Sequence, residues 1–324
     1  MAWDFSTKAQ RRADRAHPHA PRDGPRGLRL VARGGHVERL TGVALLAVAL
    51  ACGLAACSGE QARARVPTPT VDHFDERRAF ALLREQVERY GPRPAGSAAS
   101  RRLATRLRRL LPGGRFEAVP GGLRNVVGVL PGRAPAVVVG AHYDTEAEPP
   151  DFVGANDGAA GTAAVVELAR ALARRPPGGP EVRFVLFDGE EEPAGGDFFT
   201  EGTRGSRAYV ARHRNEVGAM VLLDYVANKG LSLPREEGSD PGLWRRLRAA
   251  AKRVGVLPAF PDATTGQVYD DHTAFAQAGI PAVDLIDFDY SYRDTAQDTV
   301  DKVSPRSLDV AGEAVAELIR SWPR

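Results

Sequence analysis

The sequence predicts an α/β protein, a three-layer sandwich in which helices cover both faces of a mostly parallel central sheet. Two observations predict it. Five short apolar runs read as buried strands, at 125–130, 136–141, 182–187, 219–223 and 282–286. Segments with helical periodicity lie before, between and after them, at 76–89, 97–111, 159–174, 204–214, 241–254 and 305–321. Nearly continuous apolar strands separated by helices are typical of a parallel sheet that is buried on both faces.

The boundaries of several helices are marked by residues that start or stop a helix. The helix at 76–89 runs into Tyr90-Gly91-Pro92, which is a stop signal. The helix at 97–111 can take Ser97 or Ser100 as its N-cap. The loop Gly154-Ala155-Asn156-Asp157-Gly158 opens the helix at 159. Because no internal repeat is present, we expect a single catalytic domain over 76–324.

The region before this domain divides into three parts. Residues 1–39 are rich in Arg, Pro and Gly and predict a disordered basic leader. Residues 40–57 form an apolar segment, either a signal peptide with a lipidation motif or a membrane segment. Residues 58–75 are polar, contain Pro and predict a linker. The positive charge lies before the domain. Residues 1–57 have a net charge of +5 and the whole chain has +3, so residues 58–324 have a net charge of −2. A body without basic excess argues against a nucleic-acid partner.

The apolar segment predicts export. No charged side chain occurs from 40 to 58, and basic residues come before it, as in a secretory signal. Its end, Leu54-Ala55-Ala56-Cys57, resembles the lipobox of bacterial lipoproteins, in which the peptide is cut before a cysteine that becomes lipidated. We therefore expect a protein tethered to the membrane through Cys57 on the periplasmic or cell-surface side. An uncleaved anchor and a cytoplasmic protein are the alternatives.

The composition restricts the chemistry of the body. Both cysteines, Cys52 and Cys57, belong to the apolar segment, so residues after 57 contain no thiolate nucleophile and no cysteine ligand. Acidic residues and a histidine follow the predicted strands: His142 and Asp144 after one, Glu190 and Glu191 after the next, and Asp224 after a third. Ligands bind beyond the carboxyl ends of strands in such sheets. Clustered carboxylates with a histidine indicate a catalytic Zn²⁺ site.

These residues carry a family resemblance. The motifs appear in the order His142-x-Asp144, Gly154-Ala155-Asn156-Asp157, Phe187-Asp188-Gly189-Glu190-Glu191, Leu223-Asp224 and Asp270-Asp271-His272. They resemble the zinc aminopeptidase family with co-catalytic metals, and the stretches 270–286 and 294–308 resemble its bacterial glutaminyl cyclase branch. The resemblance spans about 76–321 and implies the zinc exopeptidase form of the predicted sandwich.

The resemblance also implies roles for single residues. Asp157 and Glu191 fall on metal ligands, and Glu190 on the general acid and base. With two zinc ions, His142, Asp157 and Asp224 would hold the second. With one zinc ion, as in the cyclases, Asp224 and Asp271 would instead hydrogen-bond around the reacting centre.

One position departs from the family. The last zinc ligand is a histidine in a Trp-His-Thr motif, and this chain has Arg293-Asp294-Thr295. A carboxylate can bind zinc, so Asp294 is the expected ligand. Arg293 could instead pair with Asp294 and draw it off the metal, and His272 is a conceivable substitute ligand.

Three functions follow from these expectations. The first is a glutaminyl-peptide cyclotransferase with one zinc ion, which converts an N-terminal Gln of a peptide or protein to pyroglutamate and releases ammonia. The second is an aminopeptidase with two zinc ions, in which Glu190 is the base for an activated water. The third, suggested by the change at Asp294, is a metal-poor binding protein on the same fold.

Overall fold

The structure is a computed structural model that describes residues 65–323. The predictions for the leader, for the apolar segment and for Cys57 lie outside these residues. None of the described helices combines the length and the hydrophobicity needed to span a bilayer.

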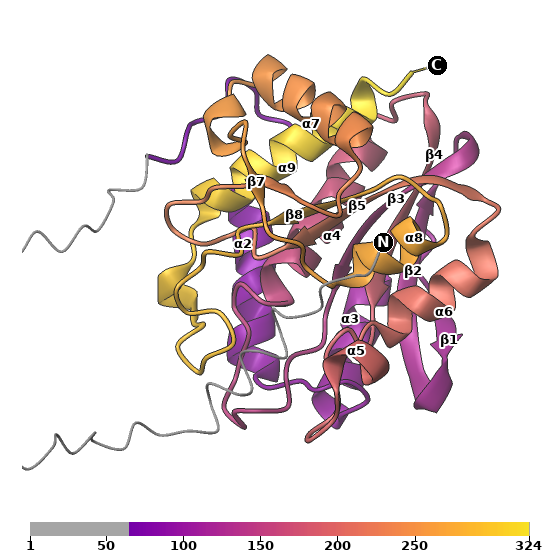
Figure 1. The fold of residues 1–324 in the computed structure, drawn as a ribbon, viewed down its shortest axis with the longest axis vertical. Helices are drawn as coiled ribbons and strands as arrows, with labels where there is room; N and C mark the ends of the chain where they lie inside the picture. Colours follow the sequence, from indigo (N-terminus) through magenta and orange to yellow (C-terminus); the bar gives the residue numbers. More distant parts are fainter. Residues whose placement is uncertain (1–64, 324) are drawn as a thin grey trace, which may run out of the picture.

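A six-stranded sheet forms the centre of the molecule, in the order β1-β2-β4-β3-β5-β8 (Figure 1). Strands β3, β4, β5 and β8 are parallel to one another, whereas β2 is antiparallel to both β1 and β4. The strands are β1 (Arg115–Val119), β2 (Leu123–Leu130), β3 (Arg133–His142), β4 (Pro180–Phe187), β5 (Val217–Asp224) and β8 (Ala282–Ile286). A separate pair joins β6 (Arg235–Glu236) to β7 (Thr264–Thr265).

Helices cover both faces of the sheet, as the sequence predicts (Figure 1). One face is covered by α2 (Glu76–Glu85), α3 (Ala98–Leu110), α4 (Ala159–Arg174), α7 (Pro241–Arg253) and α9 (Pro305–Arg320). The other face is covered by α6 (Arg204–His213) and α8 (Asp271–Gln277). The short α5 (Phe198–Glu201) precedes α6, a π-helical turn (Gln86–Tyr90) extends α2, and three 3-10 turns span Pro120–Gly122, Leu257–Ala259 and Val300–Lys302.

The alternation of side chains along each strand explains the two layers of helices. In β3, Val137 and Val139 belong to the core beneath α4, while Val138 belongs to the core beneath α6 and α8. All three are at most 1% exposed. Since successive residues of a strand point to opposite faces, a strand with apolar residues throughout must be covered twice.

The predicted strands and helices are confirmed within a few residues, but two features differ. The run at 125–130 belongs to β2, which is antiparallel to its neighbours. Only Pro131 and Gly132 connect β2 to β3, which lies beyond β4 in the sheet. A connection that short cannot carry the chain back to the other end of the sheet, so β2 must run opposite to β3 and to β4. Strand β1, at the edge of the sheet, was not predicted.

The last residues of the predicted linker, 58–75, contact the catalytic domain. Phe74 is fully buried against α9, and its amide donates to Glu313 Oε1 at 2.8 Å. The amide of Thr70 donates to the Val254 carbonyl at 2.9 Å. These residues are therefore part of the domain, because apolar burial and backbone pairing hold them to it.

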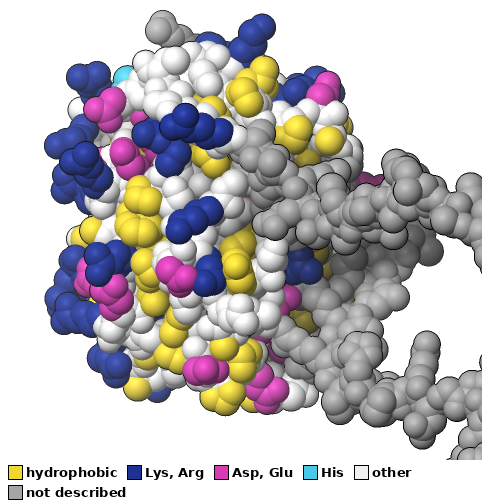
Figure 2. Space-filling view, turned by 90° about the vertical axis from the view of Figure 1, so that its left-hand side faces the viewer, with side chains coloured by type: hydrophobic (Ala, Val, Ile, Leu, Met, Phe, Trp, Pro, Cys, Tyr) yellow, Lys and Arg dark blue, Asp and Glu magenta, His cyan; other side chains and the backbone are white. Residues whose placement is uncertain are grey.

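The surface carries both signs of charge. On the face in Figure 2, Lys and Arg side chains are interspersed with acidic and apolar ones. Ion pairs elsewhere in the described part of the chain include Arg84 with Glu88 at 2.8 Å and Arg106 with Glu85 at 3.1 Å. These exposed pairs each contribute at most about 1 kcal/mol.

Candidate metal and catalytic site

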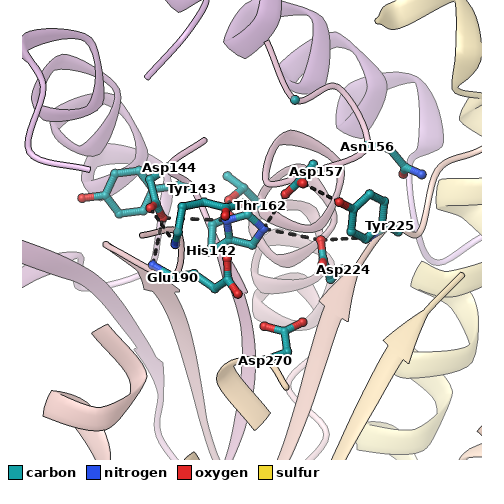
Figure 3. Close-up of polar contacts among 12 residues, drawn as sticks. His142, Tyr143, Asp144, Asn156, Asp157, Thr162, Glu190, Asp224, Tyr225 and Asp270 are labelled. Carbon is teal, nitrogen blue, oxygen red and sulfur yellow. Dashed lines mark hydrogen bonds and ion pairs between the residues drawn. The ribbon is translucent and has the colours of Figure 1, made fainter. Parts of the chain in front are cut away.

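The predicted site residues meet at the carboxyl edge of the sheet (Figure 3). His142 is the last residue of β3 and Asp224 the last residue of β5, while Glu190 and Glu191 follow β4. Asp157 lies in the loop before α4. Because β3, β4 and β5 are parallel, their carboxyl ends bring these residues together. All five side chains are buried, with exposures from 1% to 6%.

His142 lies at the centre of the cluster. Its Nε2 lies 3.1 Å from Asp157 Oδ1 and 3.4 Å from Asp224 Oδ1. Two sets of side chains in the described part of the chain could close on a metal ion: His142 with Asp157 and Asp224, and His142 with Glu190 and Glu191. Asp294 belongs to neither set. The trio that the cyclase resemblance implies, Asp157 with Glu191 and Asp294, is thus not one of these two sets.

The donors fit zinc. One imidazole and two carboxylates are the ligand types of a catalytic zinc site. Within residues 65–323, neither ring nitrogen of His142 makes a well-aligned hydrogen bond, although carboxylate oxygens surround the buried ring. A cation shared by these groups would satisfy them. Because His142 Nε2 lies 3.1 Å from Asp157 and 3.4 Å from Asp224, we take His142, Asp157 and Asp224 as the set that would hold it, rather than His142 with Glu190 and Glu191.

The pKa shifts show how strongly these groups interact. Burial opposes the charged form of His142, but the neighbouring carboxylates of Asp144, Asp157 and Asp224 outweigh it and raise the pKa well above its ordinary value. Burial raises the pKa of Asp224 to about 7, in part opposed by His142. Binding of a cation must therefore displace protons from the site.

Asp144 connects two parts of the site (Figure 3). Its Oδ1 accepts from the amide of Glu190 at 3.3 Å, and its Oδ2 accepts from the amide of Glu191 at 3.2 Å. Its Oδ1 also lies 3.7 Å from His142 Nδ1. Asp144 therefore lies on the Nδ1 side of the ring, while Nε2 faces Asp157 and Asp224, which is the arrangement of a carboxylate behind a metal-binding imidazole.

The loop that presents Asp157 is held by Asp298. The Asp298 carboxylate accepts from the amides of Asn156 and Asp157 at 3.0 Å and from the Tyr290 hydroxyl at 2.8 Å. Gly158 then has φ of 78°, and a Cβ there would lie 2.6 Å from the Asp144 carbonyl oxygen. Only glycine lets α4 begin this close to the site.

A buried arginine braces the same loop. Arg93 is fully buried, and its guanidinium donates to the carbonyls of Tyr143 at 2.9 Å, Val153 at 2.6 Å and Gly154 at 3.1 Å. Burial lowers the pKa of Arg93 to about 10, while Asp157 and other carboxylates oppose the shift. Arg93 therefore remains a cation at neutral pH and fixes the segment between β3 and Asp157.

A small pocket opens beside these residues. Its lining combines acidic and apolar side chains: Asp157, Glu190, Glu191, Asp224, Asp270, Tyr225, Val268, Tyr269, Ile286 and Phe288. Asp270 lines the pocket, and Figure 3 places it on the same side of the site as Asp224. The predicted catalytic residue Asp271 is fully buried and is not among the residues that line the pocket. It is the first residue of α8, and the residue before it, Asp270, is the N-cap of that helix.

Asp294 is engaged by its neighbours. Its Oδ1 accepts a hydrogen bond from the Tyr225 hydroxyl at 2.9 Å, and its Oδ2 lies 3.5 Å from Arg293 Nε. The pairing with Arg293 that the sequence suggested is therefore present. His272 pairs with Glu236 at 3.2 Å and lies 3.6 Å from Asp284, outside both sets of metal ligands. It does not substitute for Asp294.

Fold and site together define an α/β enzyme with a cation site at the carboxyl edge of its sheet. Residues 125–319 match the model of Peptidase family M28, and the chain belongs to this family. Aminopeptidase YwaD of Bacillus subtilis is 29% identical over 198 residues, which are 56% of this chain and 40% of that relative. The chain thus spans less than half the length of this relative.

Two solved structures extend the comparison. A glutaminyl cyclase from an Acidobacteriales bacterium is 30% identical, with a TM-score of 0.69, over 76% of this chain and 94% of that chain. A Zn-dependent exopeptidase from Parabacteroides distasonis is 25% identical, with a TM-score of 0.68, over 78% and 99% of the two chains. The prediction of a zinc-type enzyme is confirmed, and the non-catalytic binding protein is set aside.

Sequence reasoning missed three residues that shape the site: Arg93, Tyr225 and Asp298. Asp298 lies inside the predicted motif at 294–308, so it could have been found there. Arg93 follows the Gly91-Pro92 helix stop, and a single arginine in a loop carries no local signal of burial. Tyr225 follows Asp224 directly, and nothing in the sequence shows which way its side chain turns.

Proposed function

We propose that this enzyme is a glutaminyl-peptide cyclotransferase, which converts an N-terminal Gln to pyroglutamate with release of ammonia. The observation that carries the proposal is the small acidic pocket beside the cation ligands. Its lining combines these carboxylates with apolar and aromatic side chains, Val268, Tyr269, Ile286 and Phe288 among them, which suits the first residue of a peptide. Its carboxylates suit the α-amino group that only a chain terminus offers.

The reaction needs a proton carrier and no water. The α-amine attacks the side-chain amide carbon, a C–N bond forms to close the lactam, and the amide C–N bond breaks to release ammonia. Glu190, which lines the pocket, takes a proton from the amine and transfers it to the departing nitrogen. Asp270, which lines the pocket, would accept a hydrogen bond from the amine. A zinc ion held by His142, Asp157 and Asp224 would supply a Lewis acid for the amide carbonyl.

The second candidate is an aminopeptidase. The trio His142, Asp157 and Asp224 favours it, because the family resemblance gives this trio to the second ion of two-metal members. The 29% identity to the Bacillus aminopeptidase supports it as well. An aminopeptidase would consume water and release the first residue, so the products separate the two reactions.

Our proposal for the location of the enzyme in the cell is supported by the sequence alone. The basic leader, the apolar segment and Leu54-Ala55-Ala56-Cys57 support an exported enzyme that is lipidated at Cys57 and held at a membrane. Its substrates would be peptide or protein N-termini outside the cytoplasm. Nucleic acid is not proposed as a partner, since residues 58–324 carry a net charge of −2.

Product analysis with the zinc-loaded full chain tests the proposal. A peptide that begins with Gln should lose one ammonia and keep its length, while the same peptide with an acetylated N-terminus should stay unchanged. Mass spectrometry distinguishes the cyclised peptide from a peptide shortened by one residue. Release of free Gln with a shortened peptide would establish the aminopeptidase instead. No change in the Gln peptide by the zinc-loaded chain would refute the cyclase.

A further inference from the structure

The hydroxyl of Tyr225 lies between two carboxylates of the site. It is 2.5 Å from Asp157 Oδ2 and 2.9 Å from Asp294 Oδ1 (Figure 3 shows the first contact). Tyr225 is 4% exposed. Asp157 therefore faces two ways, because its Oδ1 lies toward His142 and its Oδ2 toward Tyr225.

Tyr225 reaches this position through an uncommon backbone conformation. Its φ is 48°, in the left-handed region, which costs a residue other than glycine on the order of 1–3 kcal/mol. Two contacts hold it there: its amide donates to Asp224 Oδ1 at 2.9 Å, and its ring packs with that of Tyr290, with centroids 5.9 Å apart. The surrounding structure thus selects this placement of the hydroxyl.

The hydroxyl occupies the space that a second ion would need. Zinc shared by Asp157 Oδ2 and Asp294 Oδ1 would lie about 2.0–2.2 Å from each oxygen. The phenolic oxygen already lies within hydrogen-bonding distance of both. Without a cation, two facing carboxylates repel each other. A hydroxyl proton shared between them relieves part of that repulsion.

The other oxygen of Asp294 also has a partner from the chain. Arg293 Nε lies 3.5 Å from Asp294 Oδ2, and the guanidinium stacks 4.1 Å above the centroid of the Phe288 ring. Tyr225 and Arg293 together therefore supply the donor and the positive charge that a metal would otherwise bring to Asp294.

We propose that Tyr225 stands in for the second cation and restricts the site to one metal ion, held by His142, Asp157 and Asp224. Tyr225 is a positioning residue in this account, since it acts through Asp157 and Asp294. The inference rests on the metal-dependent function proposed above. It concerns the number of bound ions, so the product formed does not decide it.

The test is the zinc content of the purified full chain, measured by mass spectrometry of the metal after removal of loosely bound ions. The wild type should retain one zinc per chain. Tyr225→Phe keeps the ring and removes the hydroxyl, so Asp157 and Asp294, with Glu191 as the third ligand that the family resemblance implies, should recruit a second zinc and the count should rise to two. Tyr209→Phe is the matched control, because it removes a buried tyrosine hydroxyl from the core cluster on the opposite face of the sheet and should keep the count at one.

Three results would overturn the inference. One is two zinc ions in the wild type, a measurement that requires no variant to fold. Another is an unchanged count of one in a folded Tyr225→Phe variant. The last is a tyrosinate absorption band that appears as zinc is added to the wild type and is missing in Tyr225→Phe, since Tyr225 would then be a ligand. A chain that binds one zinc and forms neither product would refute the proposed reaction and leave this inference intact.

Discussion

Replacement of Arg93 by methionine should destabilise the fold by about 3–5 kcal/mol, the range found when one partner of a buried charged group is removed. The guanidinium donates to the carbonyls of Tyr143, Val153 and Gly154. Methionine fills a similar volume but leaves these three buried acceptors without their donor, at about 1–3 kcal/mol each. Methionine also removes the cost of burying the charged guanidinium, and this offsets part of the loss from the three acceptors. The net decrease in the free energy of unfolding should therefore lie at about 3–5 kcal/mol.

Urea unfolding of the full chain measures the effect. Arg89→Met is the control, because Arg89 is 73% exposed on its side chain and its pairing with Glu85 at 3.6 Å should contribute little. Arg93→Lys should fall between the two, since one ammonium cannot match the directions of a guanidinium. Zinc affinity of Arg93→Met should drop about 10–100-fold, as for other residues that support metal ligands. A midpoint of Arg93→Met equal to that of Arg89→Met would refute the reasoning.

Three further predictions address catalysis, pH and location. Glu190→Gln should lower turnover about 10²–10⁴-fold with zinc retained, whereas Asp224→Asn should lose zinc; zinc loss in the first variant would contradict this division. Burial and nearby carboxylates raise the pKa of Asp309 from 3.8 to about 7. The folded state therefore holds the extra proton between these values, so the free energy of unfolding falls as pH rises through this window. Asp309→Asn should raise the melting temperature at pH 8 more than at pH 4, and an equal change at both would count against it. Cys57→Ser should release the body from membranes or leave the precursor uncut; an unshortened chain in the membrane fraction for both proteins would favour a plain anchor.

Local pattern was sufficient for most of the architecture. The apolar runs that became β3, β4, β5 and β8 have no polar alternation, which is a property of the residues themselves and predicts burial on both faces. The helix at 159–174 was predicted with its bounds, because the Gly-rich loop before it is a local signal. The direction of β2 was not predicted, since direction depends on what a strand pairs with.

The position of the site followed from the same reasoning. Parallel strands end at one edge of the sheet, so residues that directly follow them must meet there. His142, Asp157, Glu190, Glu191 and Asp224 do meet, and all are buried. The choice between the two possible sets of ligands did not follow, because the resemblance offered both and the distances between side chains distinguish them.

The sequence by itself thus determined β2, β3, β4, β5 and β8, the longer helices that flank them, and the set of acidic residues and histidine at the strand ends, because burial periodicity and chain order are properties of consecutive residues. Only the tertiary structure decided which of those residues face one another. The pairing of Asp294 with Tyr225, the choice of Asp270 over Asp271 on the pocket wall and the burial of Arg93 all depend on contacts between distant segments. Such contacts are set by packing and by the need to satisfy buried polar groups, which no local pattern specifies.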